Sequence, residues 1–114
     1  MPQYVVMGDR VADHFAVFNA AVQRNDWTDF LATFTPDAVM SFEGIPVGPF
    51  AGRDAIAAAY AEQPPDDTMT CLSDDRNGDD DVVRFAWDAG GSGTMRVTWR
   101  DGKVATLNIA FDPR

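Results

Sequence analysis

Hydrophobic residues in the first half of the chain recur at the spacing of amphipathic helices. From Asp9 onward, large apolar side chains return every three or four residues, at Val11, Phe15, Phe18 and Val22. Asn25 or Asp26 should end this helix and cap a second one. The second helix has its predicted buried side at Trp27, Phe30, Leu31 and Phe34 and should end before Pro36, since proline lacks a backbone N–H. An alanine-rich third helix is predicted over Arg53–Glu62.

The rest of the chain alternates with the period of β-strands. Strands are predicted over Ala38–Phe42, Thr68–Ser73, Asp81–Asp88, Thr94–Arg100 and Val104–Asp112. Asn77-Gly78 and Asp101-Gly102 are hairpin signals, and residues 90–93 form a flexible hairpin loop. Residues 43–52 contain three glycines and two prolines and predict a loop with a short strand near Phe50. Residues 1–7, with Tyr4, Val5 and Val6, are expected to form a loose arm.

Helices early and a strand meander late predict one α+β domain over residues 1–114. We expect a curved antiparallel sheet whose concave face is covered by the three helices. The meander also carries apolar or small residues on both faces of its strands. Because one layer of helices covers only one face, a homodimer is expected.

Charge and composition exclude several classes of partner. The net charge is −9, from 18 acidic and 9 basic residues, so neither nucleic acid nor an anionic membrane is an expected partner. No apolar run is long enough to span a membrane, and the N-terminus lacks the pattern of a secretory signal. The single cysteine, Cys71, should be a core residue, and a cytoplasmic location fits.

Four short stretches have a distinctive order and spacing: residues 18–21 (FNAA), 25–27 (NDW), 34–39 (FTPDAV) and 50–56 (FAGRDAI). Together they resemble the nuclear transport factor 2-like superfamily, also called the SnoaL-like or ketosteroid isomerase-like fold. The resemblance covers roughly residues 11–112. It implies a cone-shaped fold that encloses a mostly apolar pocket.

The resemblance also locates the groups used by ketosteroid isomerases, which are a carboxylate base and an oxyanion hole made of a tyrosine and a protonated aspartate. Their positions fall on Phe42, Phe18 and Met95 in this sequence. Three apolar side chains therefore stand where that reaction needs polar ones. What the resemblance implies is a pocket for an apolar small molecule, with substrate-binding residues predicted at Phe18, Met40, Phe42, Phe85, Trp87, Met95 and Val97.

Three residues are candidates for catalysis. His14 lies one helical turn before Phe18 and is either a general base at the pocket mouth or a boundary residue of a partly exposed helix. Glu43 follows the lost base position but alternates away from the pocket, and Asp88 lies at a strand end.

No metal site and no cofactor are predicted. The chain lacks a second histidine. Asp75, Asn77 and Asp79 have the spacing that begins a calcium loop, but the positions for its glycine and its final glutamate hold Asp80 and Ala86, so residues 74–81 are interpreted as a solvated turn.

Three functions stay open. One is a small enzyme that acts on a ring-containing metabolite, similar to SnoaL-like polyketide cyclases and isomerases. Another is a non-catalytic carrier or sensor of an apolar small molecule. The third is a dimeric protein-interaction scaffold.

Overall fold

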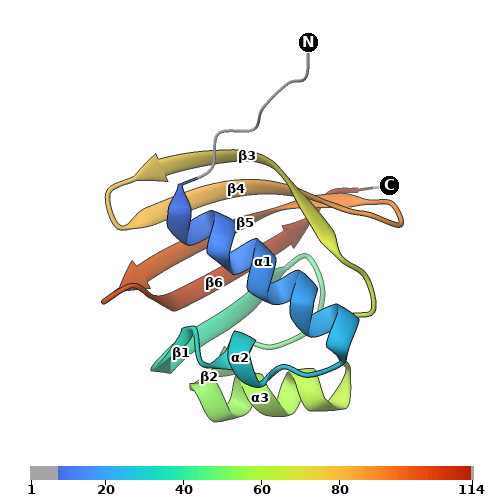
Figure 1. Ribbon diagram of the computed structural model, residues 1–114, viewed down its shortest axis with the longest axis vertical. Helices are drawn as coiled ribbons and strands as arrows, with labels where there is room; N and C mark the ends of the chain where they lie inside the picture. The colour runs from blue at the N-terminus through green and yellow to red at the C-terminus, as the bar shows by residue number, and fades with distance from the viewer. Residues whose placement is uncertain (1–7, 114) are drawn as a thin grey trace.

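Three helices and six strands follow one another in a computed structural model that describes residues 8–113 (Figure 1). The arm expected at residues 1–7 lies outside the described residues. In chain order the elements are α1 (Asp9–Arg24), α2 (Thr28–Leu31), β1 (Phe34–Glu43), β2 (Phe50–Ala51), α3 (Arg53–Glu62), β3 (Met69–Asn77), β4 (Asp80–Trp87), β5 (Ser92–Arg100) and β6 (Lys103–Phe111).

The strands form one curved sheet in the order β2-β1-β6-β5-β4-β3, and the helices lie together on one of its faces (Figure 1). This confirms the predicted α+β class. Strands β3 to β6 are the predicted antiparallel meander. The expectation of a wholly antiparallel sheet is wrong at one pairing, because β1 runs parallel to β6. The two strands lie far apart in the sequence, so no hairpin turn dictates their direction.

The joint between α2 and β1 differs from the expected one. The helix ends at Leu31, and the strand begins at Phe34, which is fully buried. Pro36 lies inside this strand, where the register with β6 shifts between Phe34 and Val39. A proline is tolerated there because the regular ladder, which would need its N–H, is interrupted.

The connection between α1 and α2 follows the prediction in part, because Asn25 ends α1 but the N-cap of α2 is Trp27. Asn25 ends α1 in the left-handed conformation, with φ 52° and ψ 43°. Asp26 accepts a hydrogen bond from the backbone N–H of Thr28 at 3.0 Å, which satisfies a free donor at the start of α2.

A second contact fastens α1 to the edge strand β3. The side-chain amide of Asn19 donates to the carbonyl of Met69 and accepts from its N–H, and both distances are 2.9 Å. The amide therefore bonds to the strand backbone as a neighbouring strand would. This pairing sets where α1 lies along the sheet.

An aromatic core joins the helices to the sheet. Phe30 of α2 is 1% exposed, and its ring lies 5.1 Å from that of Phe34 and 5.6 Å from that of Phe18, measured between centroids. Edge-to-face pairs of this kind add to the stability gained from burial. Cys71 is buried, as predicted, and burial raises the pKa of its thiol.

Candidate functional site: a cavity between the helices and the sheet

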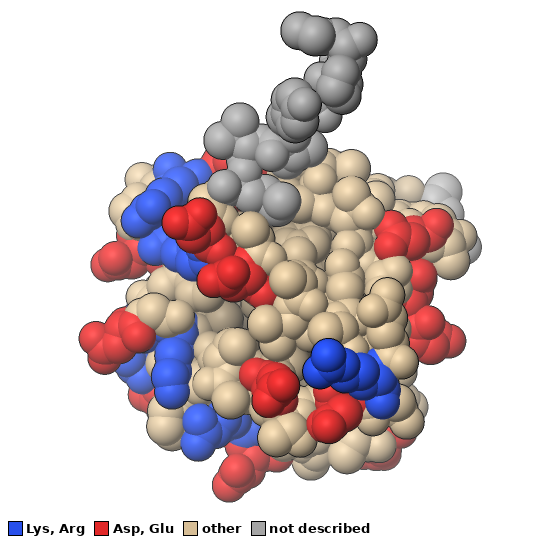
Figure 2. All heavy atoms as spheres, in the orientation of Figure 1, with Lys and Arg blue, Asp and Glu red and all other residues tan. Residues whose placement is uncertain are grey.

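A cavity of about 760 Å³ lies between the helices and the concave face of the sheet, open on one side. The side chains around it come from all three helices, the loop after β1, the segment after α3, the turn after β4 and all six strands. The closed end consists of buried residues that include Phe30, Met40, Phe85 and Met95. In Figure 2, uncharged side chains fill much of the middle of the face that carries the helices, and most charged ones lie around it.

Six of the seven predicted pocket residues line this cavity: Phe18, Met40, Phe42, Phe85, Trp87 and Met95. Val97 does not, and it is packed in the core with 1% of its surface exposed. The three positions transferred from the ketosteroid isomerases, at Phe18, Phe42 and Met95, thus converge on one space. Their role in binding a ligand stays a prediction.

Several wall residues were not predicted. Phe111 lies on the face of β6 that also carries Leu107 and Ile109, and it stacks on Phe42 with ring centroids 6.1 Å apart. The alternation of β6 was a usable signal for it. Ile45 and Val47 line the mouth while 39% and 42% exposed, and nothing in their glycine- and proline-rich loop indicates where the loop folds.

His14 lies on the cavity wall and not at an exposed helix boundary. Its side chain is buried, with the residue 5% exposed, and its ring packs 5.3 Å from Phe30 and 6.3 Å from Trp99. Burial lowers the pKa of His14 to about 4, so the imidazole is neutral near pH 7. Among residues 8–113, Nδ1 of His14 has no hydrogen-bond partner.

Tyr60 of α3 is the second buried polar side chain of the wall. It is 8% exposed, and burial raises the pKa of its hydroxyl, which keeps its proton. The hydroxyl donates to the thioether sulfur of Met40 at 3.5 Å, which is a weak acceptor. The ring of Trp27 stacks on Tyr60 at 4.7 Å and holds it in place.

The two carboxylates proposed for catalysis lie elsewhere. Glu43 is the exposed last residue of β1 and is not part of the cavity wall. Asp88 follows β4, where it accepts hydrogen bonds from the hydroxyls of Thr68 and Thr70. These bonds lower the pKa of Asp88 and use its oxygens to join the ends of β3 and β4.

The mouth of the cavity is acidic. Glu62, Asp66 and Asp67 contribute to the lining, and no lysine or arginine of the described chain does. Asp67 also accepts a hydrogen bond from the backbone N–H of Ala89 at 2.9 Å, which ties the segment after α3 to the turn after β4. The mouth therefore carries three carboxylates, whereas the buried part of the wall carries none.

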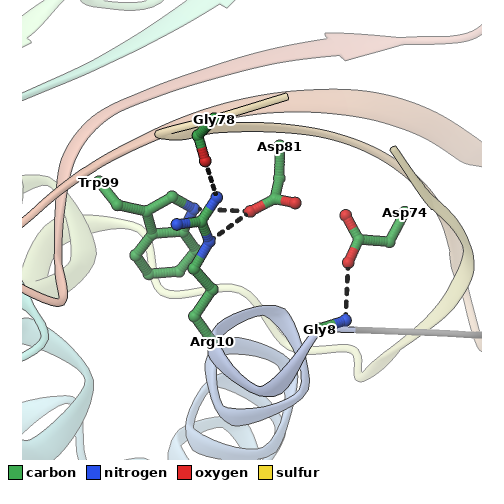
Figure 3. Close-up of polar contacts among 6 residues, drawn as sticks. All are labelled: Gly8, Arg10, Asp74, Gly78, Asp81 and Trp99. Atoms are coloured by element: carbon green, nitrogen blue, oxygen red, sulfur yellow. Dashed lines mark hydrogen bonds and ion pairs between the residues drawn. The ribbon is translucent and has the colours of Figure 1, made fainter. Parts of the chain in front are cut away.

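A polar cluster outside the cavity corrects part of the interpretation of residues 74–81 as a solvated turn, since residues 75–80 are exposed but Asp81 is buried. Strand β3 continues to Asn77, and Asp81 is 1% exposed (Figure 3). Asp81 accepts hydrogen bonds from Nε of Arg10 at 2.7 Å and from Nε1 of Trp99 at 2.9 Å. Side chains at alternate positions of β4 point inward, as those of Val83 and Phe85 do, and Asp81 occupies the next such position. Its side chain is therefore buried with theirs.

This cluster anchors the start of α1. Arg10 also donates to the carbonyl of Gly78 at 3.0 Å, and Asp74 accepts from the N–H of Gly8 at 2.9 Å (Figure 3). Burial and the neighbouring carboxylate of Asp81 raise the pKa of Asp74. Burial opposes the charge of Asp81, but the neighbouring Asp74 carboxyl and the hydrogen bonds from Arg10 and Trp99 outweigh burial and lower its pKa. The cluster is a clasp between α1 and the β3–β4 hairpin.

The described part of the chain also lacks two further features. Residues 8–113 contain no group of three side chains that could hold a metal ion. None of the three helices is long and apolar enough to cross a membrane.

Comparison with solved structures supports the fold. The chain is 25% identical to a candidate polyketide cyclase from Sinorhizobium meliloti, with a TM-score of 0.67 over 90% of this chain and 99% of that one. A candidate isomerase from Bacillus subtilis is 17% identical, with a TM-score of 0.74 over 94% of this chain and 91% of that one. A candidate ketosteroid isomerase from Kribbella flavida is 15% identical, with a TM-score of 0.71 over 93% of this chain and 80% of that one.

No curated protein sequence matches this chain. The sequence profile of the SnoaL-like domain, however, matches residues 11–107, which is most of the chain. The cone of three helices on a curved sheet is the architecture that this profile implies. The chain therefore belongs to the SnoaL-like domain family, within the nuclear transport factor 2-like superfamily.

Proposed function

We propose that this protein binds a small, apolar, ring-containing molecule in the cavity between its helices and its sheet. The observation that carries the proposal is a space of about 760 Å³ walled by aromatic and aliphatic side chains. Pockets of this size and character hold small organic ligands. A ligand that buries about 200 Å² of apolar surface would gain roughly 5 kcal/mol before the costs of association.

A matched pair of variants on α3 tests this proposal. Ala59 lines the cavity and Ala58, its neighbour, is exposed. Ala59→Phe should fill the space and weaken the binding of two-ring and four-ring compounds at least tenfold, whereas Ala58→Phe should leave binding unchanged. The fluorescence of Trp87, which lines the cavity, reports occupancy, with Trp87→Phe as the optical control. Equal binding by both alanine variants would place the ligand elsewhere.

A second candidate is catalysis on such a ring compound, and His14 on the wall is the observation that favours it. Two of the similar structures are named as a candidate cyclase and a candidate isomerase. A neutral imidazole can exchange a proton with a bound hydroxyl or carbonyl. His14→Gln should then abolish turnover of a bound ring ketone while its binding persists, and unchanged turnover would remove His14 from the reaction.

We also propose that the protein is a homodimer formed through the face of the sheet opposite the helices. Small or half-buried side chains occur on this face, among them Val82, Ala86 and Ala110. Arg84 is neutralised there by a double hydrogen bond to Asp112, at 3.0 and 2.8 Å. Sedimentation should give a dimer at micromolar concentration. Ala110→Glu should dissociate it and Ala58→Glu should not, whereas a monomeric wild type would contradict the proposal.

A further inference from the structure

Two buried carboxylate oxygens of the clasp have no hydrogen-bond partner in the described chain. Asp81 accepts hydrogen bonds from Arg10 and Trp99 through Oδ2. Asp74 accepts one from the N–H of Gly8, also through Oδ2. The remaining oxygen of each carboxyl group, Oδ1, is buried and bonds to nothing. Buried polar atoms are normally hydrogen-bonded, so these two oxygens call for a partner.

The pairing of β3 with β4 directs the two oxygens toward each other. Asp74 lies opposite Val83, whose side chain is fully buried. Asp81 is two residues before Val83 and on the same face of β4, so the two carboxyl groups are diagonal neighbours. In Figure 3 the free oxygen of each carboxyl group points toward the other group. One partner between them can therefore satisfy both.

The charges around the pair leave one negative charge uncompensated when both carboxyl groups are ionised. Arg10 of α1 contributes one positive charge. The thiol of Cys71 on β3 is neutral near pH 7, because burial and the charge of Asp74 raise its pKa. Trp99 of β5 contributes an uncharged indole. Two carboxylates beside one guanidinium thus lack one unit of positive charge, and an unpaired charge is costly to bury.

A proton meets this need with the oxygens at hand, whereas a metal ion does not. Ca²⁺ takes about six to eight oxygen ligands, but residues 8–113 contain no group of three side chains that could hold a metal ion. A proton needs one donor oxygen and one acceptor oxygen, and it replaces the repulsion between two carboxylates by a hydrogen bond. Burial and the neighbouring carboxylate of Asp81 raise the pKa of Asp74, which agrees with a proton on Asp74.

We propose that Asp74 and Asp81 hold one proton between their Oδ1 atoms, and that this proton makes the clasp on α1 sensitive to pH. With the proton in place, a hydrogen bond joins the two carboxyl groups across β3 and β4. When rising pH removes the proton, the two carboxylates repel each other and the start of α1 loosens. The effect extends to the cavity wall, because the ring of Trp99 packs 6.3 Å from that of His14.

Carbon-13 nuclear magnetic resonance of the aspartate side chains tests the proton directly. In wild type the carboxyl carbon of Asp74 should titrate above the ordinary value for aspartate, and the indole N–H of Trp99 should shift with the same midpoint. Asp74→Asn should remove this step from the Trp99 signal. Asp81→Asn should lower the Asp74 midpoint, because an amide donor replaces the carboxylate that shares the proton. Asp75→Asn, at an exposed site, should change neither signal.

The pH dependence of stability shows whether the proton fastens α1. The pKa of Asp74 is raised in the folded protein, so its contribution to stability is complete below the ordinary value and is lost as the pH rises through the raised one. Asp74→Asn offers a donor to Asp81 at every pH. The urea midpoint of this variant should therefore increase relative to wild type as the pH rises, whereas Asp75→Asn should show no such increase.

Three results would overturn the proposal. An Asp74 carboxyl group that titrates at or below the ordinary value would show that both groups are ionised in the clasp. A constant difference in urea midpoint between Asp74→Asn and wild type across the pH range would refute the sensitivity to pH. A wild-type midpoint raised by Ca²⁺ or Na⁺ relative to tetramethylammonium at equal ionic strength, with no such effect in Asp74→Asn, would place a metal ion where the proton is proposed.

Discussion

The buried imidazole of His14 predicts a loss of stability in mild acid. Its pKa lies near 4 in the folded protein and near 6.5 when the chain is unfolded, because burial disfavours the charged form. At a pH between these two pKa values, His14 is protonated in the unfolded chain and neutral in the folded protein. The contribution of neutral His14 to stability is therefore complete above about pH 6.5 and is lost as the pH falls toward 4.

The size of the effect follows from the shift. A displacement from 6.5 to about 4 corresponds to about 3 kcal/mol when it is fully expressed. At pH 5 about 2 kcal/mol of this should already be lost. Urea unfolding at pH 7.5 and pH 5 measures it. His14→Phe contains the same carboxylates, so the difference between the pH dependences of the two proteins isolates the histidine.

Nuclear magnetic resonance provides an independent measurement, since the chain contains one histidine and should show one imidazole titration. The midpoint should lie near 4 in the native protein and near 6.5 in urea. A native midpoint close to 6.5, or equal pH dependence of wild type and His14→Phe, would refute the assigned environment of His14.

Three further predictions concern the clasp, the sheet and the reaction. Asp81→Ala should lower the free energy of unfolding by about 3 kcal/mol, because it leaves Trp99 Nε1 and Arg10 without their shared acceptor. Asp80→Ala, at an exposed neighbouring site, should change it by less than about 0.5 kcal/mol, and similar values for both in urea titrations would argue against the clasp. Gly93→Ala should cost about 1–3 kcal/mol, since the added methyl would lie 2.5 Å from the carbonyl oxygen of Ala110 and 2.8 Å from the ring of Phe85; an unshifted thermal midpoint would contradict this. Isomerisation of a 5-ene-3-ketosteroid, followed by ultraviolet absorbance, should be negligible, because Phe18, Phe42 and Met95 occupy the positions of the three polar groups that ketosteroid isomerases use. Turnover at rates usual for ketosteroid isomerases would show that this assignment of positions is wrong.

Local patterns predicted most of the elements and six of the residues that line the cavity. The helical period of Val11, Phe15 and Phe18 and the strand alternation of Phe85 and Met95 each depend on neighbours along the chain. These periods fix which side chains share a face, and burial of apolar surface then decides which face turns inward. The same logic could have found Asp81, whose inward position is set by its strand although its chemistry suggests solvent.

Long-range geometry set the features that local patterns missed. The parallel pairing of β1 with β6 joins strands separated by most of the chain. The loop carrying Ile45 and Val47 folds over the cavity mouth without any periodic signal. His14 is buried because rings from α1, α2 and β5 surround it, a packing that depends on how three separate elements come together.

The amide of Asn19 has a consequence for how copies of this protein can meet. An open sheet has two edge strands whose free backbone groups invite another strand to add. One edge, β2, is only two residues long, and at Met69 the other edge, β3, already has its backbone groups engaged by Asn19. Acidic Asp74 and Asp75 follow along that edge. Growth by strand addition is thus discouraged at both borders. Substituting Asn19 should therefore free the backbone groups of Met69 on β3 for pairing with another strand.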